Sequence, residues 1–542
     1  MSGIGVAELI ASRAADDSIG LVAGDQTWTW REVVAEAATR AQWLHEVLDP
    51  NRPANIGLLL DNTPDYVLTL FGAALAGTCV VGINATRRGT ELERDIAHTD
   101  CQFVLSDHAH LGLRDPDSTI PTVLVEDTPW APHAGAGLPT SLPDPNSLLL
   151  LIFTSGSTSA PKAVRRSSGR VAAAAPLGFS PDDGMYCAMP LIHGNALFGL
   201  LFPALAAGAR IILREKFSAS QWLDDVITQD ATFTTSVGRA LAYLLATPPS
   251  DADRNHMLKI VLAPETSPTD AAAFTERFGV PVVTGYGSSE GGITLLPSRR
   301  HGALGRAPAG TEITVLDPAT GREQDVADID ENGLLRNPDR AIGELVRRDS
   351  TGSFEGYWGN PEADTDRVRD GWFYSGDLAY RDADGVFYFA GRVGDWLRVD
   401  SENFAAAPIE RILGRYDGVD GVAVYGVPDA HSGDRVMAAV EVPDGTLDLD
   451  DFARWIDVQP DLGTKWAPTV VRLCERLPTV GHDKIDRRAL QREAWLTADP
   501  IWWRDRRDGE FRRLDDAARD AIRSAFAEHG RSNLHPEDSR VG

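Results

Sequence analysis

Lysine, cysteine and methionine are scarce in this chain of 542 residues. The only lysines are Lys162, Lys216, Lys259, Lys465 and Lys484, so arginine supplies most of the positive charge. A lysine inside a motif is therefore harder to attribute to chance here than in a lysine-rich chain.

The four cysteines lie far apart, at Cys79, Cys101, Cys187 and Cys474. They form no Cys-x-x-Cys pair and have no histidine-rich partner pattern. Neither a structural zinc site nor a disulfide framework is predicted, which indicates a reducing compartment. The N-terminus, Met-Ser-Gly-Ile-Gly-Val-Ala-Glu, lacks the basic and apolar regions of a signal peptide, so we expect a cytoplasmic protein.

Long apolar runs are also missing. The run from Val67 to Ile83 is uncharged but short for a membrane span, and Gly72 and Gly77 interrupt it, which favours a buried helix followed by a strand. The net charge of −27 argues against a general nucleic-acid or anionic-membrane surface. No nucleic-acid partner and no stable membrane insertion are expected, while peripheral membrane association and a homodimer remain open.

The length exceeds what one hydrophobic core supports, so two or three domains are expected. Short apolar runs such as Ile56–Leu60 and Cys79–Ile83 alternate with helical patterns such as Tyr66–Ala76, and residues 194–246 repeat this alternation. The pattern predicts an α/β fold with doubly wound, largely parallel sheets.

The sequence changes character after about residue 300, where short strands and many turn residues predict a small β-rich subdomain over about 300–393. It would complete an N-terminal domain spanning 1–393. A mobile α+β domain follows over 394–530, with Gly394 as its hinge because glycine accommodates large dihedral changes. Residues 531–542 form a polar, flexible tail.

Residues 148–164 contain the most informative stretch. The apolar run Leu148–Phe153 has the length of a buried strand, and Thr154-Ser-Gly-Ser-Thr-Ser-Ala-Pro-Lys162 follows it directly. Backbone N–H groups, hydroxyls and one lysine are what a polyphosphate requires. An ordinary surface turn rich in serine and threonine is the alternative, and the Walker A spacing is absent.

Three further stretches allow a functional or an ordinary interpretation. Gly285-Tyr-Gly-Ser-Ser-Glu290 could hold a purine and a magnesium ion, or could be a strand-to-turn junction. The carboxylate of Asp377 in Gly371–Asp377 could accept from ribose hydroxyls, or could belong to a turn. His193 after Pro190-Leu-Ile is, taken alone, better explained as a structural histidine.

Together and in this order, these stretches resemble the adenylate-forming (AMP-binding) superfamily of acyl-CoA synthetases, nonribosomal adenylation domains and luciferases. The resemblance covers nearly the whole chain, and it includes Gly391-Arg-Val-Gly-Asp395 and Leu477-Pro-Thr-Val-Gly-His-Asp-Lys484. The latter looks like the loop that carries the catalytic lysine of the family.

The resemblance implies ATP, Mg²⁺ and coenzyme A as cofactors or co-substrates. It implies that Lys484, Glu290 and Arg392 are catalytic, and that Glu290 and Thr158 hold the metal. His193 and Gly285 would bind the acyl substrate. The residues implied to bind the nucleotide are Thr154, Ser155, Gly156, Ser157, Thr158, Lys162, Tyr286, Gly287, Ser289, Asp377 and Arg392.

Finer features are similar to bacterial long- and very-long-chain fatty acyl-CoA synthetases of the fatty-acid-transport-protein branch. They are Asn62-Thr-Pro-Asp65, Asn84-Ala-Thr-Arg-Arg88, Arg392–Arg398, Ser401-Glu-Asn-Phe404 and Ala498-Asp-Pro-Ile-Trp-Trp503. This resemblance implies that a long-chain fatty acid or a steroid side-chain acid is converted to acyl-AMP and then to acyl-CoA.

The chain departs from the family pattern at several positions. Ser159 replaces a loop glycine, Ala263-Pro-Glu265 replaces a glycine-rich turn, Asp400-Ser401 replaces Lys-Gly, and Asp483 replaces the glycine before the lysine. These departures predict reduced or shifted activity. Ser159 and Asp483 also leave open a degenerate member that binds nucleotide without turnover. A fatty acyl-AMP ligase that loads a carrier protein is a separate alternative, although no inserted segment before the small domain favours it.

Overall fold

The computed structural model describes most of the chain in two compact units. Unit 1 comprises Met1–Pro308 and Arg348–Phe373, and unit 2 comprises Ala309–Arg347 and Tyr374–Gly542. The described residues are 3–87, 89–153, 162–175, 178–264, 266, 268–298, 300, 302–330, 335–348, 353–392, 396–399, 402–430, 434–442, 447–459, 462, 466–480, 484–504, 509–528, 531–532 and 535–536.

Unit 1 contains two sheets that are almost entirely parallel. The first has the order β13-β12-β11-β9-β10-β1-β2, and only the edge strand β2 is antiparallel to its neighbour. Its strands are β1 (Ile19–Ala23), β2 (Gln26–Thr29), β9 (Gly184–Cys187), β10 (Arg210–Leu213), β11 (Phe233–Thr235), β12 (Ile260–Leu262) and β13 (Val282–Val283).

The second sheet has the order β6-β5-β3-β4-β7-β8, with β8 antiparallel to β7. Every residue of its central strand β3 is buried, as expected of a parallel strand covered on both faces. Its strands are β3 (Asn55–Leu59), β4 (Cys79–Gly82), β5 (Val104–Ser106), β6 (Thr122–Leu124), β7 (Leu148–Phe153) and β8 (Ala163–Ser167).

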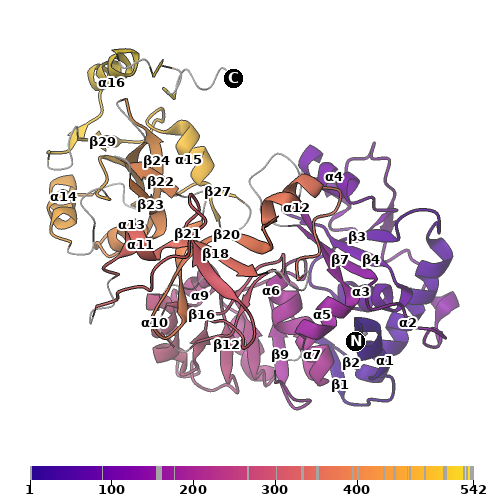
Figure 1. Ribbon diagram of the computed structural model, residues 1–542. Coiled ribbons are helices and arrows are strands. Elements are labelled where there is room, and N and C mark those ends of the chain that lie inside the picture. The colour runs from indigo at the N-terminus through magenta and orange to yellow at the C-terminus, as the bar shows by residue number, and fades with distance from the viewer. Residues whose placement is uncertain are drawn as a thin grey trace. The chain divides into compact units, whose positions relative to one another are not determined.

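Helices α2 and α3 pack against each other in unit 1 (Figure 1), and local sequence explains where both begin. Thr29 and Glu32 form a capping box at the start of α2. Thr63 caps α3, Pro64 occupies its first turn, and Gly77 ends it in the left-handed conformation, with φ of 69°. The helices of unit 1 are α1 (Val6–Ala11), α2 (Trp30–Val47), α3 (Pro64–Ala76), α4 (Gly89–His98), α5 (Ser168–Ala174), α6 (Gly194–Ala196), α7 (Phe202–Ala207), α8 (Trp222–Thr228), α9 (Gly238–Leu245), α10 (Pro268–Phe278) and α12 (Pro361–Arg367).

The apolar helical segment after His193 contains an irregular turn. Leu197–Leu201 is a π-helix between α6 and α7, and its side chains are largely buried. Single π-turns inside helices are frequent at functional sites.

Unit 2 begins with antiparallel strands, which agrees with the β-rich character predicted after residue 300, although β20 (Trp372–Arg381) is longer than the short strands expected. β17 (Ile313–Leu316) pairs with β18 (Gly343–Arg348), and β20 pairs with β21 (Val386–Arg392), both antiparallel. The short helix α11 (Pro338–Ala341) precedes β18.

The C-terminal part of unit 2 is the predicted α+β body. Its sheet has the order β24-β25-β26-β29-β30 and buries both faces. Val424 packs on one face while its neighbours Ala423 and Tyr425 pack on the other, the alternation expected of a strand. The elements are β22 (Trp396–Val399), β23 (Glu402–Ala405), α13 (Ala406–Leu413), β24 (Gly421–Pro428), β25 (Asp434–Glu441), α14 (Leu449–Asp457), β26 (Val470–Cys474), β27 (Thr479–Val480), β28 (Lys484–Ile485), α15 (Arg487–Glu493), β29 (Ile501–Trp503), β30 (Arg512–Arg513) and α16 (Asp516–Glu528).

The predicted domain boundaries and the hinge stay predictions, since Gly394 lies outside the described residues. Among the residues that are described, every helix falls short of the length and apolar character that a membrane span requires.

Candidate active site

The predicted phosphate loop lies between two paired strands of unit 1. β7 is the buried strand expected at Leu148–Phe153, and β8 returns beside it. The loop residues Thr154, Ser155, Gly156, Ser157 and Thr158, together with Ser159, lie outside the described residues. Lys162 is described, half-buried, immediately before β8.

A segment from far along the sequence continues the sheet beside β8. The Arg165 N–H donates to the Gly356 carbonyl at 3.0 Å, and the Trp358 N–H donates to the Ala163 carbonyl at 2.8 Å. Tyr357 is thereby held opposite the strand that follows the phosphate loop. The Lys162 Nζ atom lies 5.7 Å from the centroid of the Tyr357 ring, which is within cation–π range.

Glu290, the predicted metal ligand, is buried and hydrogen-bonded to the same tyrosine. The Tyr357 hydroxyl donates to Glu290 Oε1 at 3.0 Å. Arg367 Nε donates to the Tyr357 oxygen at 3.0 Å, while Arg367 Nη2 lies 3.6 Å from Glu290 Oε1. Guanidinium, phenol and carboxylate therefore form a chain of hydrogen bonds.

The backbone around Glu290 is tightly enclosed. Arg166 Nη1 donates to the Glu290 carbonyl at 3.4 Å. Gly291 has φ of 66°, and a Cβ there would overlap the Arg166 guanidinium. A Cβ on Gly292 would overlap the Phe373 ring. Glycine is required at both positions, so the two glycines in the sequence after Glu290 have a steric explanation.

Burial shifts the titration of the polar groups around Glu290. Burial, reinforced by the Glu290 charge, raises the pKa of Tyr357 well above its usual value. The phenol is therefore neutral near pH 7 and acts as a hydrogen-bond donor. Burial likewise lowers the pKa of Arg166, although the negative charges of Glu355 and Glu290 oppose this change.

The residues around Glu290 suit a magnesium ion better than a soft metal. Within the described part of the chain, no three His, Cys, Asp or Glu side chains cluster as a metal site. Magnesium typically binds through one or two carboxylates plus water and substrate phosphates, so a single buried glutamate fits it.

Two of the predicted stretches of unit 1 lie next to each other. Tyr286 and Gly287 form the short strand β14 and pair with β15 (Thr294–Leu295). A Cβ built on Gly194 would lie 3.7 Å from the Ser289 hydroxyl oxygen, so the turn after His193 adjoins the stretch that contains Glu290. His193 is exposed, and its backbone N–H donates to the Pro190 carbonyl at 3.0 Å.

Gly285 is half-buried directly before β14. An added Cβ there would approach Leu262 at 3.7 Å and Pro297 at 3.8 Å, which is ordinary van der Waals contact. The departure at Ala263-Pro-Glu265 begins with a buried alanine, and Glu265 lies outside the described residues.

Two predicted residues are brought together in unit 2. Asp377 and Arg392 are register partners on the antiparallel strands β20 and β21. Asp377 is half-buried, and its N–H donates to the Ser375 hydroxyl at 3.0 Å. The preceding N–H, of Gly376, donates to Glu344 Oε1 at 2.8 Å. Two hydrogen bonds thus fix the backbone that leads into Asp377.

Lys484 begins β28, the second strand of a short hairpin with β27. The base of the hairpin is anchored by the Asp486 N–H, which donates to the Pro478 carbonyl at 2.8 Å. Arg487, at the start of α15, pairs with Glu410 at 2.7 Å. Asp483 lies outside the described residues.

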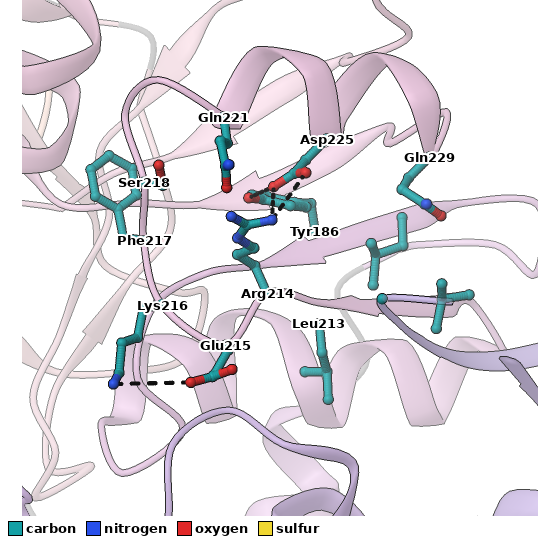
Figure 2. A pocket seen from close by; sticks show the side chains of 13 residues that line it. Tyr186, Leu213, Arg214, Glu215, Lys216, Phe217, Ser218, Gln221, Asp225 and Gln229 are labelled. Atoms are coloured by element: carbon teal, nitrogen blue, oxygen red, sulfur yellow. Dashed lines mark hydrogen bonds and ion pairs between the residues drawn. The ribbon is translucent and has the colours of Figure 1, made fainter. Parts of the chain in front are cut away.

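A cavity of about 580 Å³ lies elsewhere in unit 1, around the loop that follows β10. None of its lining residues is among those predicted from the sequence. Figure 2 shows the Tyr186 hydroxyl and Arg214 both directed at Asp225, with oxygen–oxygen and nitrogen–oxygen distances of 2.8 and 3.4 Å. These contacts pair three of the polar side chains that line the cavity.

Tyr357, Arg367 and Arg166 were not predicted as site residues. A sequence signal was available for Tyr357, because Gly356-Tyr-Trp-Gly-Asn-Pro361 sets an aromatic pair before a helix start, and Asn360 caps α12. Nothing in the sequence signals that Arg367 would reach Tyr357.

Two family models match this chain. The model for AMP-binding enzymes matches residues 10–358, and that for the AMP-binding enzyme C-terminal domain matches residues 408–484. A steroid-22-oyl-CoA synthetase of Rhodococcus jostii is 45% identical to this chain, over 98% of each sequence. A medium/long-chain-fatty-acid–CoA ligase, FadD17, of Mycobacterium marinum is 40% identical, over 92% of this chain and 98% of its own.

Solved structures share the fold. ATP-bound MatB from Rhodopseudomonas palustris has a TM-score of 0.77 at 23% identity, and covers 90% of this chain and 98% of its own. The anthranilate–CoA ligase AuaEII, in complex with anthranoyl-AMP, has a TM-score of 0.78 at 20% identity, with 92% and 98% covered. The predicted fold class and reaction class, AMP-forming acid–thiol ligation, are confirmed. This chain belongs to the family of AMP-binding enzymes, and within it to the acyl-CoA synthetases.

Proposed function

We propose that this enzyme activates a steroid side-chain acid, with long-chain fatty acids as secondary substrates, and transfers the acyl group to coenzyme A. The observation that carries the proposal is the 45% identity to a steroid-22-oyl-CoA synthetase over 98% of both chains. The 40% identity to a medium/long-chain-fatty-acid–CoA ligase supports the secondary substrates.

In the first half-reaction the substrate carboxylate attacks the α-phosphorus of ATP, forming acyl-AMP and releasing pyrophosphate. Charge accumulates on the phosphoryl oxygens, so positioning and electrostatic stabilisation would dominate catalysis. Lys162 and the hydroxyl-rich loop, Ser155 and Thr158 included, would hold the β- and γ-phosphates. Tyr286, Gly287 and Ser289 would contact the base, and Asp377 the ribose.

Glu290, with Thr158, would hold a magnesium ion. The buried, hydrogen-bonded carboxylate of Glu290 supports this assignment. Bound magnesium would neutralise charge on the phosphate oxygens.

Lys484 would contact the α-phosphate and the acyl oxygen, assisted by Arg392. Rotation about Gly394 would then withdraw Lys484 and admit coenzyme A, whose thiol attacks the acyl-AMP carbonyl and displaces AMP. His193 and Gly285 would line the acyl pocket. The intact lysine and glutamate argue for turnover, despite the departures at Ser159 and Asp483.

The direct test of substrate is thioester formation, followed by mass spectrometry, with a C22 steroid carboxylate, palmitate, octanoate and benzoate. We expect kcat/KM for the steroid acid to exceed that for palmitate by about tenfold, which corresponds to about one additional buried methylene group. A preference for benzoate would refute the proposed substrate class. Formation of acyl-AMP without thioester would indicate a ligase that loads a carrier protein. Binding of nucleotide without release of pyrophosphate would indicate a degenerate member of the family.

Lys484→Ala tests the role of the lysine. We expect ATP–pyrophosphate exchange to fall on the order of 10²–10³-fold, the scale for removing one aimed donor. Thioester formation from supplied acyl-AMP should persist, because the lysine would act only in the first half-reaction. Unimpaired exchange would show that the assignment is wrong.

A further inference from the structure

The carboxylate of Glu290 is held asymmetrically. The Tyr357 hydroxyl donates a hydrogen bond to Oε1, and the ion pair with Arg367 is also formed with Oε1. An anionic carboxylate with one oxygen occupied by a donor keeps the lone pairs of the other for a cation.

The tyrosine, rather than the arginine, orients this carboxylate. Arg367 Nη2 lies 3.6 Å from Oε1, too far for a hydrogen bond, whereas the Tyr357 hydroxyl lies at 3.0 Å. Arg367 instead donates to the phenol oxygen at 3.0 Å. Because a phenol oxygen that accepts one hydrogen bond directs its own proton elsewhere, Arg367 orients the Tyr357 hydroxyl toward Glu290.

Tyr357 cannot easily adopt another position. Its N–H donates to Asp364 Oδ1 at 2.7 Å, and its ring meets Phe354 edge-on with centroids 5.2 Å apart. The flanking backbone is hydrogen-bonded to β8. A side chain fixed in this way transmits its orientation to its hydrogen-bond partner.

The same ring adjoins the lysine of the predicted triphosphate site. Lys162 Nζ lies 5.7 Å from the ring centroid, while the hydroxyl at the edge of the ring contacts Glu290. One side chain therefore connects the cation proposed to hold the β- and γ-phosphates with the carboxylate proposed to hold the metal.

We propose that Tyr357, oriented by Arg367, is a positioning residue that presents the Glu290 carboxylate to the metal of a metal–ATP complex. The inference rests on the proposed roles of Glu290 and Lys162. It predicts that losing the hydroxyl weakens the contribution of the metal to nucleotide binding, and leaves binding of metal-free nucleotide nearly unchanged.

The experiment measures binding of α,β-methylene-ATP by calorimetry, with and without Mg²⁺, for the wild type and Tyr357→Phe. This analogue cannot be cleaved between its α- and β-phosphates, so the readout is independent of turnover. We expect the factor by which Mg²⁺ raises the affinity to be about tenfold smaller in the variant than in the wild type. This is the scale of one hydrogen bond to a charged group. Its affinity without Mg²⁺ should stay within a factor of about two.

Tyr186→Phe is the matched control. Tyr186 is also buried and donates to a carboxylate, Asp225, at 2.8 Å, but lies outside the predicted site. We expect this variant to keep the wild-type gain from Mg²⁺.

Arg367→Met and Arg367→Lys provide the second test, and decide the question if Tyr357→Phe does not fold. Methionine should reduce the Mg²⁺-dependent gain, and lysine should restore part of it by donating to the phenol. The inference would be overturned if Tyr357→Phe and Arg367→Met kept the full Mg²⁺-dependent gain in affinity for the analogue. It would also be overturned if they lost affinity equally with and without Mg²⁺. A wild type that binds no nucleotide would instead refute the proposed function.

Discussion

The Glu410–Arg487 ion pair is predicted to control the adenylation step at a distance. Arg487 donates to both carboxylate oxygens of Glu410 at 2.7 Å, and it begins the helix that follows the Lys484 hairpin. Glu410 also accepts from the Val424 N–H at 2.8 Å, so the pair joins α15 to the central sheet of unit 2. The Glu410 side chain is 15% exposed and the Arg487 side chain 25%, which limits screening of the ion pair by solvent.

Glu410→Gln removes the negative charge but keeps an oxygen for the Val424 N–H. A charge-assisted hydrogen bond contributes about 1.5–3 kcal/mol, and the remaining exposure places this loss near the lower limit. If docking of the hairpin depends on the pair, about 1.5 kcal/mol lowers the docked fraction by up to tenfold. We therefore expect ATP–pyrophosphate exchange to fall by up to about tenfold.

The matched control is Asp429→Asn. Asp429 pairs with Arg435 at 2.6 Å, the side chains are 13% and 25% exposed, and neither residue belongs to the hairpin. Urea unfolding should report a similar loss of stability for both variants, while pyrophosphate exchange should fall only for Glu410→Gln. If exchange falls no further than in the control, the ion pair stabilises the fold without positioning Lys484.

Two further predictions concern stability. Gly292→Ala should lower the free energy of unfolding by about 1–3 kcal/mol, because the added Cβ would overlap the Phe373 ring. The control Gly112→Ala, whose Cβ would meet open space, should change that free energy little. Equal melting temperatures for the two variants would contradict this prediction. Burial alone would raise the pKa of Asp183, but hydrogen bonds from Lys259, Ser180 and Thr232 outweigh it and hold the pKa at about 2. The resulting stability, about 2 kcal/mol, should be present above about pH 4 and lost as the pH falls toward 2. Urea titrations at pH 5 and pH 2.5 should show this loss of stability in the wild type and a smaller loss in Asp183→Asn. An identical loss in both proteins would refute the prediction.

Local sequence was sufficient for most of the architecture. The strand Leu148–Phe153 is found where it was predicted, and the helix Tyr66–Ala76 and the strand Cys79–Ile83 are found to within two residues of their predicted bounds. In these segments, short-range features such as caps, apolar runs and turn residues agree with the tertiary fold. The strand β1 was not predicted, and the π-turn at Leu197–Leu201 was not anticipated because its periodicity differs little from that of an apolar α-helix.

The candidate site was predictable where a motif carries it and unpredictable where tertiary contact creates it. Glu290 and Lys162 belong to motifs, so their chemistry could be inferred from neighbours in the sequence. The hydrogen bond between Tyr357 and Glu290 joins residues 67 positions apart and depends on the chain pairing with β8. No local pattern encodes such a contact.

The pairing of β8 also affects which changes of length this part of the chain can tolerate. Lys162 lies just before β8, and Arg166 within the strand donates to the Glu290 carbonyl. Val164, midway between these two residues, pairs with Tyr357 in an antiparallel β-bridge. Side chains of a strand alternate between its faces, so inserting one residue between Lys162 and Arg166 would turn one of them to the opposite face. Variation in loop length among related enzymes should therefore occur before Lys162, and the five residues from Lys162 to Arg166 should keep a constant length.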